Sequence, residues 1–129
     1  MERSFEDFHR LSYFRTTAQQ TRKSEVAARQ FIDANAVMGM GTDSGSPLNF
    51  HTESAWREIS ALVDSGMTPL QAISVATKTG AEIIRRGNDL GTIEPGKLAD
   101  ILVVRGNPLF DINVLGYVEH VVKGGTVYR

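Results

Sequence analysis

The residues best suited to chemistry lie in the stretch "VMGMGTDSGSPLNFH", residues 37–51. A short apolar run ends there in glycines and Asp43, and His51 follows eight residues later as one of only three histidines. A carboxylate at the end of a buried strand can bind a divalent cation or accept a proton from water. The same aspartate can instead be a turn residue that bonds its own backbone. On spacing alone, the turn interpretation is favoured.

The glycines of residues 39–45 also suggest a dinucleotide-binding turn, in which the backbone approaches a pyrophosphate at a helix N-terminus. Two features oppose this. The charge of Asp43 would repel phosphate, and Ser46-Pro47 delays the helix that should begin at once. No second strand–helix unit with a ribose-binding acid follows about 20 residues on. The sequence therefore disfavours a nucleotide site.

The three histidines carry unequal weight. His51 lies at the expected start of the following helix, where it can orient a substrate carboxylate or carbonyl, or simply face solvent. His9 has no motif around it, and His120 falls within an expected strand. We interpret His9 and His120 as structural or solvent-facing.

Composition limits the classes of function. The chain has 129 residues, 41% hydrophobic and 22% charged, with a net charge of -1, which is ordinary for one soluble domain. This charge predicts no binding to nucleic acid or to an anionic membrane. The absence of cysteine excludes disulfides, thiolate metal sites and a cysteine nucleophile. No apolar run long enough for a membrane span and no secretory signal are recognisable, so we expect a cytoplasmic protein.

The first half of the chain reads as helical around one short strand. Residues 1–36 are expected to be helical, with Ser24 as a helix cap and Asn35 as a left-handed stop. The apolar run at residues 36–40 predicts a buried strand. An amphipathic helix should follow and end before Gly66.

Two further helix starts are expected before residue 87. Thr68-Pro69-Leu70-Gln71 combines a capping threonine, a first-turn proline and the glutamine of a capping box. Thr79-Gly80-Ala81-Glu82 repeats the spacing and predicts a kink or a new helix reaching Gly87.

Beyond Gly87 the pattern becomes extended. "EPGK" (94–97) predicts a type II turn, and "ADILVV" (99–104) predicts a strand. "YVEHVVK" and "TVYR" flank Gly124-Gly125 with the two-residue spacing of a tight hairpin. The tail is expected to form a small β unit.

Four sequence blocks, taken in order, are similar to a known family. They are "GTDSG" (41–45), "EISALVDSGMTPLQAISVAT" (58–77), "LGTIEPGKLADILVVRGNPLFDI" (90–112) and "VEHVVKGGTVY" (118–128). Together they resemble the C-terminal portion of metal-dependent amidohydrolases, in the branch of imidazolonepropionase-like and prolidase-like enzymes. The resemblance covers about residues 24–129.

This resemblance implies an α/β fold: an incomplete C-terminal part of a (β/α)₈ barrel, followed by a β-sandwich segment. Residues 1–87 would be the barrel part, with its last strand at 36–40, and residues 88–129 the small β-sandwich segment. Asp43 would be a metal ligand and the general base that activates water, and Ser44 and His51 would contact substrate. Pro95-Gly96 and Asp100 would be structural.

The chain departs from the family pattern in its remaining ligands. The HxH pair, the lysine and the two further histidines that the family places upstream have no counterpart here. A complete barrel typically needs about 250 residues. We therefore expect a divalent metal, zinc first, in the parent enzyme and none bound by this chain, which alone should not hydrolyse amides or dipeptides. The alternatives are a non-catalytic module that self-associates as a homo-oligomer, and one chain of a split enzyme whose missing barrel part is a separate polypeptide.

Overall fold

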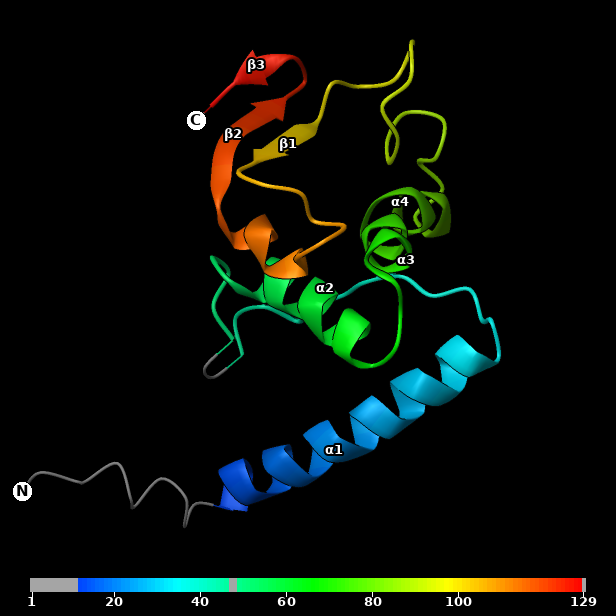
Figure 1. Ribbon diagram of the computed structural model, residues 1–129, viewed down its shortest axis with the longest axis vertical. Coiled ribbons are helices and arrows are strands. Elements are labelled where there is room, and N and C mark those ends of the chain that lie inside the picture. Colours follow the sequence, from blue (N-terminus) through cyan, green and yellow to red (C-terminus); the bar gives the residue numbers. More distant parts are fainter. Residues whose placement is uncertain (1–11, 47–48, 129) are drawn as a thin grey trace, which may run out of the picture. The chain divides into compact units, whose positions relative to one another are not determined.

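The computed structural model describes residues 12–46 and 49–128, in two units that meet between Asn35 and Ala36. The first unit contains helix α1, Ser12–Asp33 (Figure 1). Asn35 ends it in the left-handed conformation, with φ of 51° and its N–H donating to the Ile32 carbonyl at 2.9 Å, as predicted. The predicted cap at Ser24 is wrong, because Ser24 lies inside α1. His9 and the start of the predicted N-terminal helix lie outside the described residues.

The second unit begins with helices. Helix α2 spans Ser54–Asp64, and Gly66, with φ of 112°, turns the chain away from it. Helix α3, Pro69–Ser74, continues into a π-helical turn, η2, at Val75–Thr79, and then into helix α4, Gly80–Ile83. The predicted succession of two or three helices is therefore confirmed.

Only one of the two predicted capping boxes forms. The Thr68 hydroxyl accepts from the Gln71 N–H at 3.3 Å, and the Gln71 side chain accepts from the Thr68 N–H at 2.8 Å. Thr79 has helical backbone angles and makes no side-chain cap, because the π-helical turn carries the helix directly into α4. The helix also stops earlier than predicted, since Arg85 takes a φ of 60°.

A loop crosses the helical segment at Gly91. An added Cβ on this glycine would lie 2.7 Å from the Ala81 Cβ and 3.0 Å from both the Lys78 Cα and the Thr77 carbonyl oxygen. Only a residue without a side chain fits there, and its φ of 92° also favours glycine. The small core lies around these helices, with its buried hydrophobic side chains at Met67, Ala72, Val75, Ala81 and Ile112.

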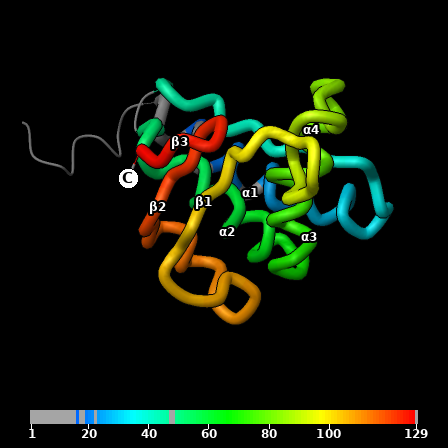
Figure 2. Tube along the Cα trace, turned by 90° about the horizontal axis from the view of Figure 1, so that it is seen from above, coloured from blue at the N-terminus to red at the C-terminus, as the bar shows by residue number. Residues whose placement is uncertain are grey.

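The C-terminal segment forms one antiparallel sheet in the order β1-β2-β3 (Figure 2). Its strands are β1, Ile101–Val104; β2, Val118–Lys123; and β3, Thr126–Val127. The 3₁₀ turn η3, Ile112–Gly116, precedes β2 and packs against α2, where an added Cβ on Gly116 would lie 3.3 Å from the Trp56 ring.

Both predicted turns of this segment are confirmed. Gly124 and Gly125, with φ of 56° and 83°, connect the paired residues Lys123 and Thr126. In the turn at residues 94–97, Gly96 has a φ of 91° and the Lys97 N–H donates to the Glu94 carbonyl at 3.3 Å. A sandwich needs a second sheet, whereas residues 49–128 contain this single sheet.

The predicted strand at residues 36–40 is not formed. The chain has no regular secondary structure from Ala36 to Asp43, because a strand needs a hydrogen-bonded neighbour and none of the described strands pairs with it. The observed division at residue 35 also differs from the predicted boundary after residue 87, which stays a prediction for a complete enzyme.

None of the helices described here is both long and apolar enough to cross a membrane.

Candidate functional site

Asp43 lies in the irregular segment between helix α1 and helix α2. Its backbone is left-handed, with φ of 49°, a conformation that is uncommon for residues other than glycine but that aspartate and asparagine adopt more often than most. Such conformations cost about 1 kcal/mol or more and persist where the surroundings enforce them, often at functional sites. Its side chain is exposed, and its carboxylate accepts no hydrogen bond from residues 12–46 or 49–128.

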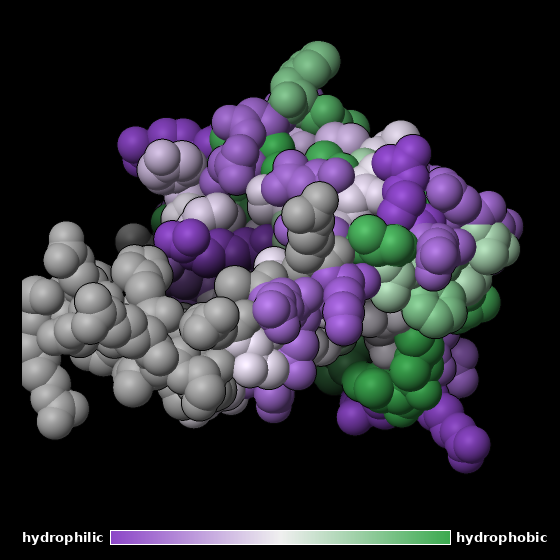
Figure 3. Space-filling view, turned by 90° about the horizontal axis from the view of Figure 1, so that it is seen from below, coloured by the Kyte–Doolittle hydropathy of each residue, from purple (hydrophilic) through white to green (hydrophobic). Residues whose placement is uncertain are grey.

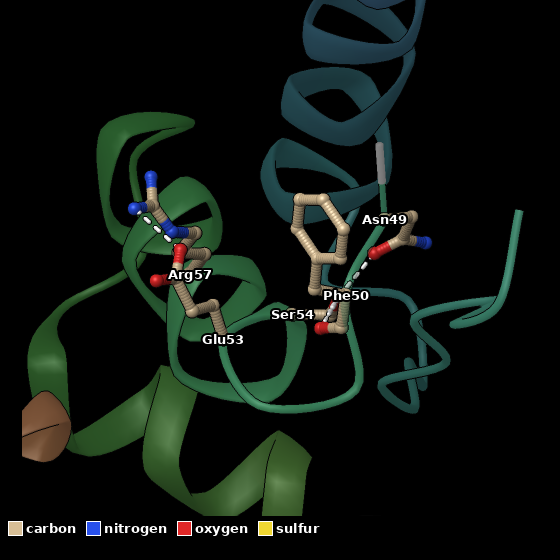
Figure 4. A network of polar contacts seen from close by, with 5 residues as sticks. All are labelled: Asn49, Phe50, Glu53, Ser54 and Arg57. Carbon is tan, nitrogen blue, oxygen red and sulfur yellow. Dashed lines mark hydrogen bonds and ion pairs between the residues drawn. The ribbon is translucent and has the colours of Figure 1, made fainter. Parts of the chain in front are cut away.

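The side chain of Asn49 bonds the carbonyl groups of the two peptides that flank Asp43. Its Nδ2 donates to the Thr42 carbonyl at 2.6 Å and to the Asp43 carbonyl at 3.0 Å. Its Oδ1 accepts a hydrogen bond from the Ser54 hydroxyl, which also faces the Phe50 carbonyl (Figure 4). Ser54 is the first residue of α2 and only 8% exposed, so the loop is anchored to the start of that helix.

The two predicted substrate-binding residues lie in the same loop as Asp43. The Ser44 hydroxyl is 2.6 Å from the Thr42 hydroxyl. The imidazole of His51 lies over Gly45, whose added Cβ would be 3.5 Å from Nε2. Their roles toward a substrate remain predictions. His120 lies on β2, opposite Val103, and is exposed.

A cavity of about 530 Å³ lies beside the loop at the start of α2. Polar side chains dominate its wall: Thr42, Asn49, Phe50, Glu53, Ser54, Arg57 and Glu58. Figure 4 shows Arg57 directed at Glu53, with Nη2 and Oε2 2.7 Å apart. The Glu58 carboxylate accepts from the Gly41 N–H at 3.1 Å and thereby ties α2 to the residues preceding Asp43. Asp43 itself is not among the lining residues.

The described residues do not fit a complete metal site. A catalytic zinc site typically has three protein ligands with one position left for water. Within residues 12–46 and 49–128, no group of three or more His, Asp, Glu or Cys side chains is placed to hold a metal ion. The loop supplies one carboxylate, from Asp43, and one imidazole, from His51, which lies over Gly45. No step of chemistry through a metal can be assigned to these residues by themselves.

Asn49, Ser54 and Glu58 are the residues of this region that sequence reasoning missed. Asparagine often bonds nearby backbone in loops, so Asn49 carried a weak local signal. Ser54 and Glu58 read as ordinary residues of an amphipathic helix. Their contacts with the Asp43 loop depend on how that helix is placed.

Comparison with known proteins gives one consistent result. A sequence model of the Amidohydrolase family matches residues 12–128. The imidazolonepropionase of Porphyromonas gingivalis is 33% identical over 114 residues, covering 86% of this chain and 27% of that protein. The imidazolonepropionase of Geobacillus kaustophilus is 35% identical over 104 residues, covering 78% of this chain and 24% of that protein.

A solved structure extends the similarity to the fold. It is a Xaa-Pro dipeptidase with methionine bound in its active site. That structure is 37% identical to this chain, with a TM-score of 0.75 over 81% of this chain and 25% of the dipeptidase. The chain thus spans about a quarter of the length of the proteins that it matches.

Proposed function

Because the chain belongs to the amidohydrolase family, in its imidazolonepropionase- and prolidase-like branch, we propose that it forms the C-terminal part of a hydrolase active site with Asp43 as the catalytic carboxylate. The observation that carries this proposal is the Asp43 loop. A left-handed backbone is held by Asn49 and presents an exposed carboxylate without a competing partner among the described residues.

The reaction that we propose is hydrolysis of an amide or cyclic-amide C–N bond. The Asp43 carboxylate accepts a proton from the attacking water, whose oxygen forms a bond to the carbonyl carbon. The proton then passes to the leaving nitrogen as the C–N bond breaks. Imidazolonepropionases and a Xaa-Pro dipeptidase among the similar proteins support a small cyclic-amide or dipeptide-like substrate. We further propose that Ser44 and His51, which lie in the same loop as Asp43, contact this substrate.

Amidohydrolases generally use a divalent metal, and we propose that Asp43 is one of its ligands in the complete site. The described residues do not supply the other ligands. On this proposal, the isolated chain is catalytically silent. The parent fold is related to the TIM barrel, with residues 36–40 pairing as its last strand once neighbouring strands are present.

A chimera tests the proposal directly. This chain replaces the matching C-terminal segment of the G. kaustophilus imidazolonepropionase, and hydrolysis of imidazolonepropionate and of Xaa-Pro dipeptides is measured. We expect activity toward at least one substrate, and Asp43→Asn should lower kcat by about 10³-fold or more because the base is lost. Asp64→Asn is the matched control, since Asp64 ends α2 and is exposed.

Two outcomes would contradict the proposal. One is a folded chimera that hydrolyses neither substrate class. The other is an active chimera in which Asp43→Asn has no more effect than Asp64→Asn.

The exposed hydrophobic surface favours a second candidate function, that of a non-catalytic module which pairs with another chain. Val37, Ile93 and Phe110 are 83%, 83% and 91% exposed, and hydrophobic surface is visible in Figure 3. Residues 36–42, which have no regular secondary structure, also have no strand partner within the described part of the chain. Unpaired backbone of this kind invites strand pairing with a second polypeptide.

Sedimentation and co-purification of the 129-residue chain distinguish a self-associating module from one chain of a split enzyme. A homo-oligomer without activity supports a self-associating module. Co-purification with a histidine-rich partner, with hydrolysis only in the mixture, supports a split enzyme. A stable monomer that gains activity in the chimera contradicts the self-associating module.

A further inference from the structure

Asn49 bonds the Asp43 loop through its backbone as well as its side chain. Besides the two bonds of its Nδ2, its N–H donates to the Ser46 carbonyl at 3.0 Å. Its carbonyl accepts from the Gly45 N–H, also at 3.0 Å. Asn49 therefore bonds four residues of the loop, namely Asp43 itself, the residue before it and two residues after it: Thr42, Asp43, Gly45 and Ser46.

The chemistry of these contacts fixes the orientation of the Asn49 amide. The carbonyl oxygens of Thr42 and Asp43 can only accept hydrogen bonds, so the NH₂ group must face them. The Oδ1 then faces the buried Ser54 hydroxyl, which can donate to it. An aspartate at position 49 would keep the acceptor for Ser54 and lose both donors toward the loop.

We infer that Asn49 is the positioning residue for the Asp43 carboxylate, a role that rests on the proposed catalytic function of Asp43. The left-handed backbone of Asp43 is unfavourable on its own. Two hydrogen bonds from the Asn49 amide hold the carbonyl groups before and after the Asp43 Cα, and they thereby restrict the φ and ψ angles of Asp43. Without these bonds the backbone of Asp43 relaxes toward negative φ, and its carboxylate points in a different direction.

The backbone of Asp43 in the complete 129-residue chain gives the first test. The HN–Hα coupling and the Cα chemical shift of Asp43 report φ in an isotope-labelled sample. In Asn49→Ala and Asn49→Asp, we expect both values to move to those of negative φ, while the resonances of the β2–β3 hairpin stay in place. Asn88→Ala, at an exposed asparagine outside the loop, should leave Asp43 unchanged.

The two variants keep this test decisive. If Asn49→Ala unfolds the chain, Asn49→Asp decides, because it retains the acceptor for Ser54 and the side-chain volume. Unfolding of both would overturn the inference, since Asn49 would then be required for the fold as a whole. Unchanged coupling and shift at Asp43 in either folded variant would also overturn it.

Kinetics in the chimera give the second test. A misdirected base affects the transition state more than substrate binding, so both Asn49 variants should lower kcat by about 10- to 100-fold and change KM by less than about twofold. A raised KM with unchanged kcat would overturn the positioning role. If the unmodified chimera is inactive, the proposed function fails, while the couplings of Asp43 still decide whether Asn49 positions it.

Discussion

At the scale of single residues, Asp43 combines an uncommon backbone with an available carboxylate. Its φ of 49° is maintained by the amide of Asn49, which in turn accepts from a buried hydroxyl of Ser54. A general base must be held in place to be effective, because small displacements of a reacting group cost much of the rate. The hydrogen bonds of Asn49 and Ser54 support the Asp43 loop, and the catalytic role proposed for its carboxylate depends on that support.

Another aspartate, Asp100, for which the family resemblance implied a structural role, bonds two residues at the turn between β2 and β3. Its carboxylate accepts from the Lys123 ammonium and, at 2.8 Å, from the Gly124 N–H, so it fastens the start of β1 to the β2–β3 turn. The hydrogen bond from Lys123, and after it that from Gly124, hold the pKa of Asp100 below its ordinary value of 3.8.

This lowered pKa gives a pH-dependent prediction. A carboxyl whose pKa is lower in the folded chain stabilises the fold above its unfolded pKa, and the contribution is lost as pH falls through the folded pKa. We expect Asp100→Asn to be less stable than the unmodified chain at pH 7, with the difference shrinking as the pH falls from about 3.8 through the lower pKa of the folded chain. Urea unfolding across this range measures it.

The partner of Asp100 provides the check. Lys123→Met should raise the pKa of Asp100, followed by the NMR titration of its carboxyl carbon, because the first cause of the shift is removed. An unchanged titration midpoint would contradict the assigned cause.

What the sequence predicted at this scale was local. Gly124-Gly125, Asn35 and the Thr68–Gln71 box act through neighbours within four residues, so their types and spacing were enough. The contact of Ser54 with Asn49 and that of Glu58 with Gly41 depend on where α2 lies. No local pattern specifies such a placement.

At the scale of elements, only one of the two threonines predicted to cap helices, Thr68 and Thr79, does so in the structure. Thr68→Ala removes an observed cap and should destabilise the chain by about 1 kcal/mol. Thr79→Ala removes no cap hydrogen bond, so its effect should stay within about 0.5 kcal/mol. Urea unfolding midpoints compare them, and equal losses would contradict the observed helix boundaries.

Glycines 91 and 96 form a second matched pair. Both have φ near 90°, at 92° and 91°, but an added Cβ at Gly91 meets the helical segment while one at Gly96 meets nothing within 4 Å. Gly96→Ala should cost about 1 kcal/mol from backbone strain. Gly91→Ala should cost about 1–3 kcal/mol more, because overpacking is added. Thermal unfolding of the two variants isolates the steric contribution, and equal losses would show that the loop does not press on the helix.

The strand predicted at residues 36–40 failed for a physical reason at this same scale. Its apolar residues and flanking glycines fit a buried parallel strand, but strand formation is a property of a pair. The antiparallel strands β1, β2 and β3 formed because their partners are close in sequence. The partners expected for residues 36–40 belong to the part of the family fold that this chain does not span.

At the scale of the whole molecule, the chain belongs to the amidohydrolase family but corresponds to only part of the length of its relatives. The family match extends over residues 12–128, yet the chain spans about a quarter of its relatives. The core among the described residues is small, and no large side chain in it is fully buried. Asp43 and its supporting residues are therefore expected to act together with groups that this chain lacks.

The zinc content and the hydrolytic activity of the purified 129-residue chain test this central claim most directly. After incubation with zinc and removal of the excess, we expect mass spectrometry to find far less than one zinc per chain. Neither dipeptides nor cyclic amides should be hydrolysed. Stoichiometric zinc together with hydrolysis, both lost in Asp43→Asn and retained in Asp64→Asn, would contradict the account, because the chain would then hold a complete active site.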